Sequence, residues 1–151
     1  MTYYFRGNAH RRMGNLDLAL KDLNQAVQID PDFKDTYIDL GILSKQRGQY
    51  TQAIKIYNRA LKIDPNFAKA YYNRGNVFFK LDQLGRAVED YDRATALEPE
   101  YFFPFIGRAW AKYALGQYAD ALSAADIALS LRPGNEDALQ IRALIVAASG
   151  K

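Results

Sequence analysis

Residues 37–65 read YIDLGILSKQRGQYTQAIKIYNRALKIDP, and the fold can be predicted from this segment. Its first half places apolar and small side chains at the i, i+3, i+4, i+7 spacing of one helix face: Tyr37, Leu40, Gly41 and Ser44. Its second half carries another helical stripe: Ala53, Ile54, Tyr57, Ala60 and Leu61. Gly48 separates the two halves, and Pro65 ends the second because proline cannot continue a helix. The stretch therefore predicts a helix, a turn and a second helix.

The same stretch recurs along the chain with a period of 34 residues. Four prolines follow this interval: Pro31, Pro65, Pro99 and Pro133. Each ends a similar phrase, AVQIDP, ALKIDP, ATALEP or ALSLRP. Small residues keep the same step at Ala19, Ala53, Ala87 and Ala121, and again at Ala26, Ala60, Ala94 and Ala128. A fixed period of this size predicts a repeat architecture, in which stacked units share a continuous core.

Glycine stands at equivalent places between the two helices of three units: Gly14, Gly48 and Gly116. A left-handed residue commonly ends a helix at such a place, and glycine adopts that conformation without strain. The third unit has Asp82 there, with Gly85 three residues later. We therefore expect that turn to differ from the other three.

The pattern resembles the tetratricopeptide repeat, whose consensus has an aromatic residue, Leu-Gly three residues later, then Ala, an aromatic, Ala and Pro. YIDLGIL, AIKIYNRA and DP within residues 37–65 match it closely, and the resemblance covers nearly the whole chain. It implies an all-α fold, a right-handed α-solenoid of helix-turn-helix repeats whose first helices line the inner face. We expect four repeats at 1–33, 34–67, 68–101 and 102–135. Residues 136–151 would form a C-terminal capping helix or a truncated fifth repeat.

Arginine replaces the consensus leucine in several units, at Arg6, Arg74, Arg108 and Arg142, whereas Leu40 keeps it. Aspartate lies sixteen residues after two of these arginines, at Asp22 and Asp90, and Ile56 lies sixteen after Leu40. This covariation predicts ion pairs Arg6–Asp22 and Arg74–Asp90 between the two helices of a unit. The alternative is that these arginines are solvated.

Arg108 has Ala124 at the distance where the other units have aspartate. It therefore needs another acceptor, and Asp90 on the preceding helix is the candidate. An ion pair of this kind would fix the register of the helices more than it would add stability, because desolvation offsets much of its gain.

Composition excludes most other functions. The chain has no cysteine and one histidine, His10, which rules out disulfides and thiolate chemistry and leaves catalysis and metal binding without support. We therefore predict no enzyme activity, no cofactor and no metal. The net charge of +3 is interleaved along the chain, so nucleic acid is not expected as a partner. No apolar run could span a membrane and no signal peptide opens the chain, which leads us to expect a cytoplasmic location.

The aromatic content is high, with Tyr 11, Phe 8 and Trp 1, and packing within the repeats explains only part of it. The remaining aromatics fall with amides and charges on inner-face positions of the first helices, as a binding groove requires and a solvated surface does not. The alternative is that these side chains are partly core. The predicted groove consists of Tyr4, Asn8, Asp39, Lys69, Tyr72, Asn73, Asn76, Phe79, Phe103, Trp110 and Tyr113. This predicts an adaptor or scaffold whose partner is another protein or a peptide segment of it.

Some members of the family clamp a C-terminal carboxylate with Lys and Asn, Asn, and Lys and Arg in three successive units. The matching places here hold Tyr4, Asn8, Asp39, Lys69 and Asn73, of which only Asn8 and Lys69 fit. Since Asp39 would repel a carboxylate, we predict an internal or extended segment instead, carrying apolar side chains and a basic residue opposite Asp35 and Asp39. The alternative function is self-assembly, a homo-oligomer through the apolar residues of 136–151.

Overall fold

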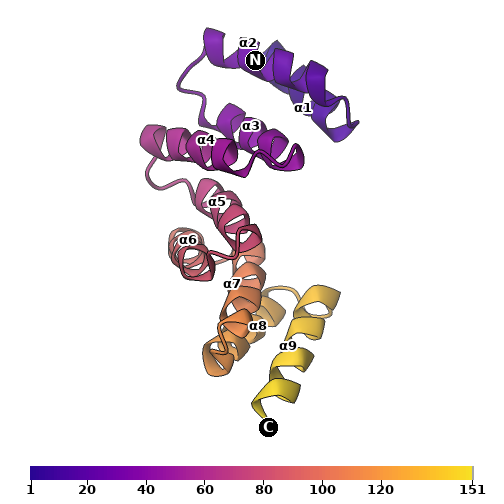
Figure 1. Cartoon of the computed structure of the whole chain (residues 1–151), viewed down its shortest axis with the longest axis vertical. Coiled ribbons are helices and arrows are strands. Elements are labelled where there is room, and N and C mark those ends of the chain that lie inside the picture. Colours follow the sequence, from indigo (N-terminus) through magenta and orange to yellow (C-terminus); the bar gives the residue numbers. More distant parts are fainter. Residues whose placement is uncertain (151) are drawn as a thin grey trace. The chain divides into compact units, whose positions relative to one another are not determined.

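The computed structural model describes residues 1–150, and every regular element in that range is an α-helix (Figure 1). The chain divides into two compact units, Met1–Asn73 and Arg74–Lys151, and the division falls within α5 (Ala68–Lys80). The first unit holds α1 (Thr2–Arg12), α2 (Leu16–Ile29), α3 (Lys34–Gln46) and α4 (Tyr50–Ile63). The second holds α6 (Leu84–Leu97), α7 (Phe102–Ala114), α8 (Tyr118–Leu131) and α9 (Glu136–Ser149). The predicted all-α helical-repeat fold is confirmed.

Helices that follow one another in sequence pack together within each unit. In the first unit α1 packs on α2, α3 packs on α4, and α3 also contacts α1 and α2. In the second unit α7 lies between α6 and α8, and α9 packs on both α7 and α8. The interiors are built from alanines and a few large apolar side chains, because small residues let helix backbones approach closely.

The turn inside each helix pair has one geometry throughout. Gly14, Gly48 and Gly116 have φ angles of 80°, 73° and 73°, and Asp82 has 57°. In all four turns the next amide donates to the carbonyl five residues earlier, at 2.9 Å. The expectation that the Asp82 turn differs is therefore wrong. Aspartate tolerates the left-handed region better than most residues, so the turn survives without glycine.

The aromatic at the start of the repeat fixes the turn that precedes it. The Tyr37 hydroxyl donates to the Pro31 carbonyl at 2.7 Å, and the Tyr71 hydroxyl donates to the Pro65 carbonyl at 3.2 Å. Within the hairpin, Tyr57 is fully buried against Gly41, where an added Cβ would lie 2.6 Å from the ring carbon Cζ. Tyrosine and glycine at these places therefore form one packing unit.

Both predicted ion pairs are present, and both are bidentate. Arg6 donates to the two Asp22 oxygens at 2.6 and 2.8 Å, and Arg74 donates to the two Asp90 oxygens at 2.8 and 2.6 Å. These bonds cross from the first to the second helix of a pair, as the sixteen-residue spacing predicts. The two aspartates are buried.

Arg108 forms an ion pair with a different residue from the one expected. Its Nε lies 2.7 Å from Asp92 Oδ1, whereas both oxygens of Asp90 are taken by Arg74. Asp92 precedes Arg108 by sixteen residues, and Asp126 precedes Arg142 by the same distance, with Nε 2.6 Å from Oδ1. An arginine at this place thus pairs either forward within its own hairpin or backward to the preceding helix.

Candidate functional site

The predicted site residues lie on the first helices of the pairs. One register recurs there, namely Tyr4, Asn8 and Arg11 on α1, Asp35, Ile38, Ile42 and Lys45 on α3, Lys69, Tyr72, Asn76 and Phe79 on α5, and Phe103, Ile106, Trp110 and Tyr113 on α7. The sets on α3, α5 and α7 follow the i, i+3, i+7, i+10 spacing of one helix face, and the α1 set holds the last three of these places; we call these sets first-helix stripes. Asp39 and Asn73 lie one position beside this register. The stripes differ in chemistry between the two units.

Asp39 is the centre of a polar network in the first unit. Asn8 Nδ2 donates to Asp39 Oδ2 at 2.7 Å, and Arg11 Nη2 lies 3.0 Å from Asp39 Oδ1. The Asp39 residue is only 5% exposed, so its charge is compensated inside the chain. Burial above all, together with the neighbouring charges of Asp39 and Asp35 and a hydrogen bond with Asp39, raises the pKa of the Tyr4 phenol to about 12.

Asp35 also has a cation of its own chain nearby. Lys69 Nζ lies 3.7 Å from Asp35 Oδ1, and about half of the Lys69 side chain is exposed. The expectation that a partner's basic residue would lie opposite Asp35 and Asp39 therefore needs correction. Arg11 and Lys69 already occupy those places, so the carboxylates organise the surface rather than attract a cation.

The two amides predicted on α5 have partners within the chain. Asn73 is buried, and its Nδ2 donates to the Lys69 carbonyl at 2.7 Å. Asn76 Oδ1 accepts from the Tyr91 hydroxyl at 2.8 Å. The prediction that these amides face a partner's backbone is not met for Asn73, because its side chain is used within its own helix. Tyr72 and Phe79, on the same stripe, are half-buried.

The α7 stripe is the most apolar of the accessible sets. Phe103 is 45% exposed, and Ile106, Trp110 and Tyr113 are half-buried. Trp110 and Tyr113 pack against the core of α7, α8 and α9, with their rings edge to face at 6.4 Å. The alternative that these side chains are partly core is therefore correct for Trp110 and Tyr113, which contact the core and stay partly accessible.

Arg132 is a neighbour of this stripe that sequence reasoning missed. Its guanidinium lies 4.6 Å from the Phe102 ring centroid and 5.0 Å from that of Phe103. Such cation–π contacts hold an aromatic ring at the surface in one orientation. The available signal was the phrase LRP, where the other units have IDP or LEP.

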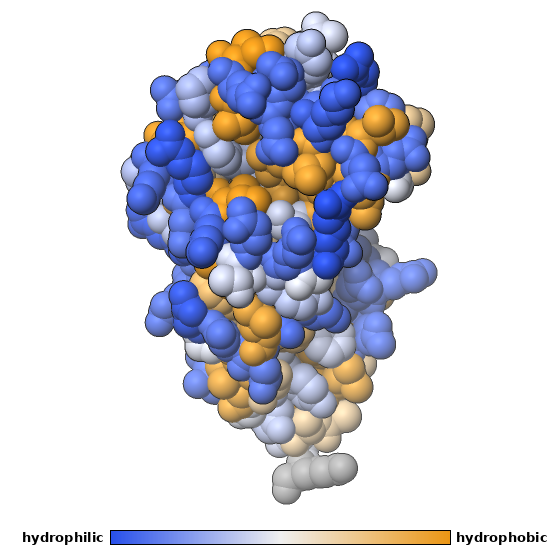
Figure 2. All heavy atoms as spheres, turned by 45° about the horizontal axis from the view of Figure 1, so that its top comes forward, coloured by the Kyte–Doolittle hydropathy of each residue, from blue (hydrophilic) through white to orange (hydrophobic). Residues whose placement is uncertain are grey.

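Apolar side chains also reach the surface elsewhere. On the face displayed in Figure 2 they form patches separated by hydrophilic residues. Phe5 on α1 is 64% exposed, and Leu139 and Val146 on α9 are each 48% exposed. Among residues 1–150, no three His, Asp or Glu side chains converge as a metal site would require. None of the helices from Thr2 to Ser149 combines the length and apolar character needed to cross a bilayer.

Comparison with protein families decides what this repeat is. Models described as tetratricopeptide repeat match residues 1–33, 68–101 and 106–151, and a model described as TPR repeat matches residues 44–82. The chain belongs to the tetratricopeptide repeat family. It has no significant match among curated protein sequences.

Solved structures of tetratricopeptide repeat proteins are similar over most of the chain. A crystal structure of the MamA protein is 26% identical with a TM-score of 0.85, covering 99% of this chain and 81% of that one. The first TPR domain of Spaghetti (RPAP3), bound to the HSP90 peptide SRMEEVD, is 25% identical with a TM-score of 0.76, covering 78% and 94%. The Arabidopsis OM64 TPR domain, 23% identical with a TM-score of 0.73 and covering 76% and 94%, shares the fold.

Proposed function

We propose that this chain is a non-enzymatic adaptor that binds an extended segment of another protein along its first-helix stripes. The observation that carries the proposal is the α7 stripe, where Phe103, Ile106, Trp110 and Tyr113 stay accessible on a helix already packed by α6 and α8. Aromatic side chains of this kind dominate the energy of peptide recognition because they are large and rigid. The RPAP3 relative bound to a peptide supports the same use of the fold.

The chemistry of the stripes indicates which segments would bind. The α7 stripe offers aromatic edges, which suit apolar side chains. The α1 stripe of the first unit offers Tyr4, Asn8 and Arg11, whose polar groups already bond Asp39. A terminal carboxylate would find no unpaired cluster of lysine and asparagine there, so we propose that recognition does not depend on the end of the peptide. Amidating the C-terminus of a bound peptide should leave its affinity unchanged.

The test is affinity capture of native partners by the wild-type chain and by Phe103→Ala. Phe103 is 45% exposed, so its truncation should leave the unfolding curve nearly unchanged. The matched control is Phe5→Ala, which removes an equally large and more exposed ring of the first unit. We expect capture to fall with Phe103→Ala and to persist with Phe5→Ala. Equal capture by all three proteins would refute the proposal.

Self-association is the second candidate, and α9 favours it. Leu139 and Val146 are each 48% exposed and Leu144 is 38% exposed, which is unusual for three large apolar side chains on one helix. We expect sedimentation velocity to show an oligomer that dissociates on dilution and is lost in Leu139→Gln/Val146→Gln. A monomer at every concentration would eliminate this candidate.

A further inference from the structure

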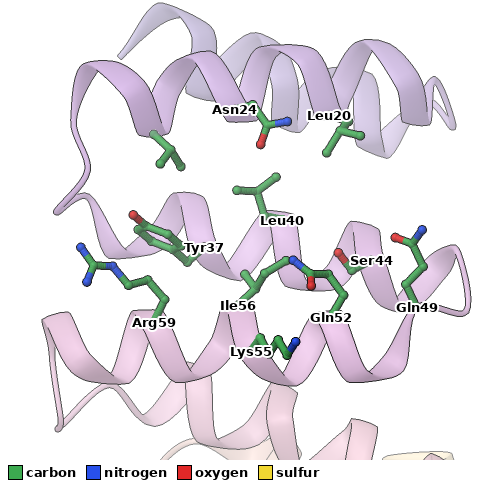
Figure 3. Close-up of a pocket in the computed structure, with 11 residues that line it drawn as sticks. Leu20, Asn24, Tyr37, Leu40, Ser44, Gln49, Gln52, Lys55, Ile56 and Arg59 are labelled. Atoms are coloured by element: carbon green, nitrogen blue, oxygen red, sulfur yellow. The ribbon is translucent and has the colours of Figure 1, made fainter.

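A groove lies between α2 and α4 of the first unit, with α3 beneath it (Figure 3). Its volume is about 450 Å³. Figure 3 shows the Leu40 side chain in the middle of the groove, with Leu20 and Asn24 of α2 on one side and Ile56 and Gln52 of α4 on the other. This α2–α4 groove is formed by second helices, so it is separate from the first-helix stripes.

The floor of the groove is apolar because the first unit lacks an arginine in α3. Leu40 belongs to the core cluster of this unit, and Leu20, Val27 and Ile56 pack against it while remaining partly exposed. Leu40 stands where other first helices carry arginine, and Ile56 stands where α2 and α6 carry aspartate. The Leu–Ile pair thus replaces an ion pair with a surface that can receive an aliphatic side chain.

The second unit shows what the same place looks like without this replacement. The residues 68 positions further along lie on α6, α7 and α8, and Arg108 takes the place of Leu40. Its Nε lies 2.7 Å from Asp92 Oδ1, and Lys112 Nζ lies 3.2 Å from Asp120 Oδ2. These four residues correspond to Leu40, Asn24, Ser44 and Gln52, so two ion pairs occupy positions that carry no charge in the α2–α4 groove.

The wall of the groove formed by α4 carries positive charge only. This helix contains Lys55, Arg59 and Lys62 and no acidic residue. Lys55 and Arg59 line the groove, and within residues 1–150 neither has a carboxylate at ion-pair distance. The two carboxylates of α2 are already bound, since Asp17 pairs with Arg47 and Asp22 with Arg6. The groove is therefore complementary to an anionic ligand.

The geometry points to a second binding site, in which the α2–α4 groove holds an acidic peptide segment of a partner protein. An aliphatic side chain of the segment would lie over Leu40 and Ile56, and its carboxylates would meet Lys55 and Arg59. Asn24, Gln49 and Gln52 at the rim carry amides that can both donate to and accept from a peptide backbone. Neither part of the ligand suffices, since an aliphatic group alone leaves the cations unpaired and an acidic group alone leaves the floor empty.

The test uses a display library of nine-residue peptides with blocked ends, composed of Asp, Glu, Lys, Ser, Leu, Ile and Val. The first variant, Leu40→Arg/Ile56→Asp, installs the pair that Arg74 and Asp90 form in this chain, so the protein itself supplies the precedent for its folding. The second, Lys55→Glu/Arg59→Glu, changes exposed side chains only. The matched control is Lys62→Glu, a charge reversal on the same helix outside the groove.

We expect the wild type to retain peptides that combine Asp or Glu with Leu, Ile or Val. Retention of these peptides should fall at least about fivefold in each double variant. For Lys55→Glu/Arg59→Glu the loss should be larger at low salt, because salt screens the interaction between charges. Lys62→Glu should change retention little. Phe103→Ala should have no effect, which separates this site from the proposed function. Absence of such enrichment, enrichment of lysine peptides, or enrichment that survives both double variants would overturn the proposal.

Discussion

Replacement of the Arg74–Asp90 pair by Leu and Ile should leave the second unit as stable as before, although each single replacement should destabilise it. Asp90 is buried and bonded through both oxygens to Arg74. Burial raises the pKa of the Asp90 carboxyl above its ordinary value, in spite of the hydrogen bonds and charge of Arg74, which lower it. The desolvation of the buried charges therefore offsets much of the stability that the ion pair contributes.

The magnitudes follow from that burial. Arg74→Leu leaves an unpaired buried carboxylate, which should cost about 2–3 kcal/mol, below the range for fully buried pairs because Asp90 can take up a proton. Arg74→Leu/Asp90→Ile should lie within about 1 kcal/mol of the wild type. Leu40 and Ile56 show that the repeat accommodates this pair of side chains.

The assay is urea unfolding of the wild type, both single variants and the double variant, followed by helical circular dichroism and by the fluorescence of Trp110. At pH 7 the carboxylate is a cost to the folded state, and this cost should disappear as the pH falls through the raised pKa. The difference between Arg74→Leu and the double variant should therefore shrink in acid. A coupling energy near zero between residues 74 and 90, so that the double variant loses as much stability as the two single variants together, would contradict this prediction.

Two further outcomes are expected. Gly41→Ala should lower the free energy of unfolding by about 1–3 kcal/mol, because its Cβ would lie 2.6 Å from Tyr57 Cζ. Gly85→Ala on α6, where nothing lies within 4 Å of an added Cβ, should leave the free energy of unfolding unchanged or raise it by up to about 1 kcal/mol. Chemical denaturation of both variants measures these differences. The Tyr4 phenol should ionise near pH 12, so the stability of the folded state should fall as the pH rises above about 10. Asp39→Asn should lower the pKa of Tyr4 without returning it to the ordinary value, because burial remains. A carbon-13 titration of the tyrosine ring would measure this pKa.

The sequence predicted the interactions that repeat within one hairpin. The spacing between Arg74 and Asp90 is fixed by a helix, a tight turn and a second helix, so periodicity alone finds the pair. For Arg108 the sequence predicted the correct preceding helix but the wrong aspartate, Asp90 in place of Asp92, because the distance from Arg108 to either residue spans two helix pairs. That distance depends on how successive pairs pack, which no single hairpin determines.

The candidate site was predictable in outline and not in its details. Stripe membership follows from helical spacing, which predicts that Phe103 and Trp110 share one face of their helix. The groups that compensate the buried Asp39 carboxylate, Asn8 and Arg11, come from a different helix pair. Their convergence is a tertiary event, and a single sequence contains no spacing rule for it.

Photo-crosslinking from position 103 would show whether the α7 stripe contacts a partner protein. A photoreactive phenylalanine analogue in place of Phe103 keeps the ring where the α7 stripe is most exposed, and the same analogue at Ala119, exposed on α8, serves as the control. The account predicts that irradiation in native extract joins position 103 to an internal segment of a discrete partner and joins position 119 to none. Identical adducts from both positions, or none from position 103, would contradict it.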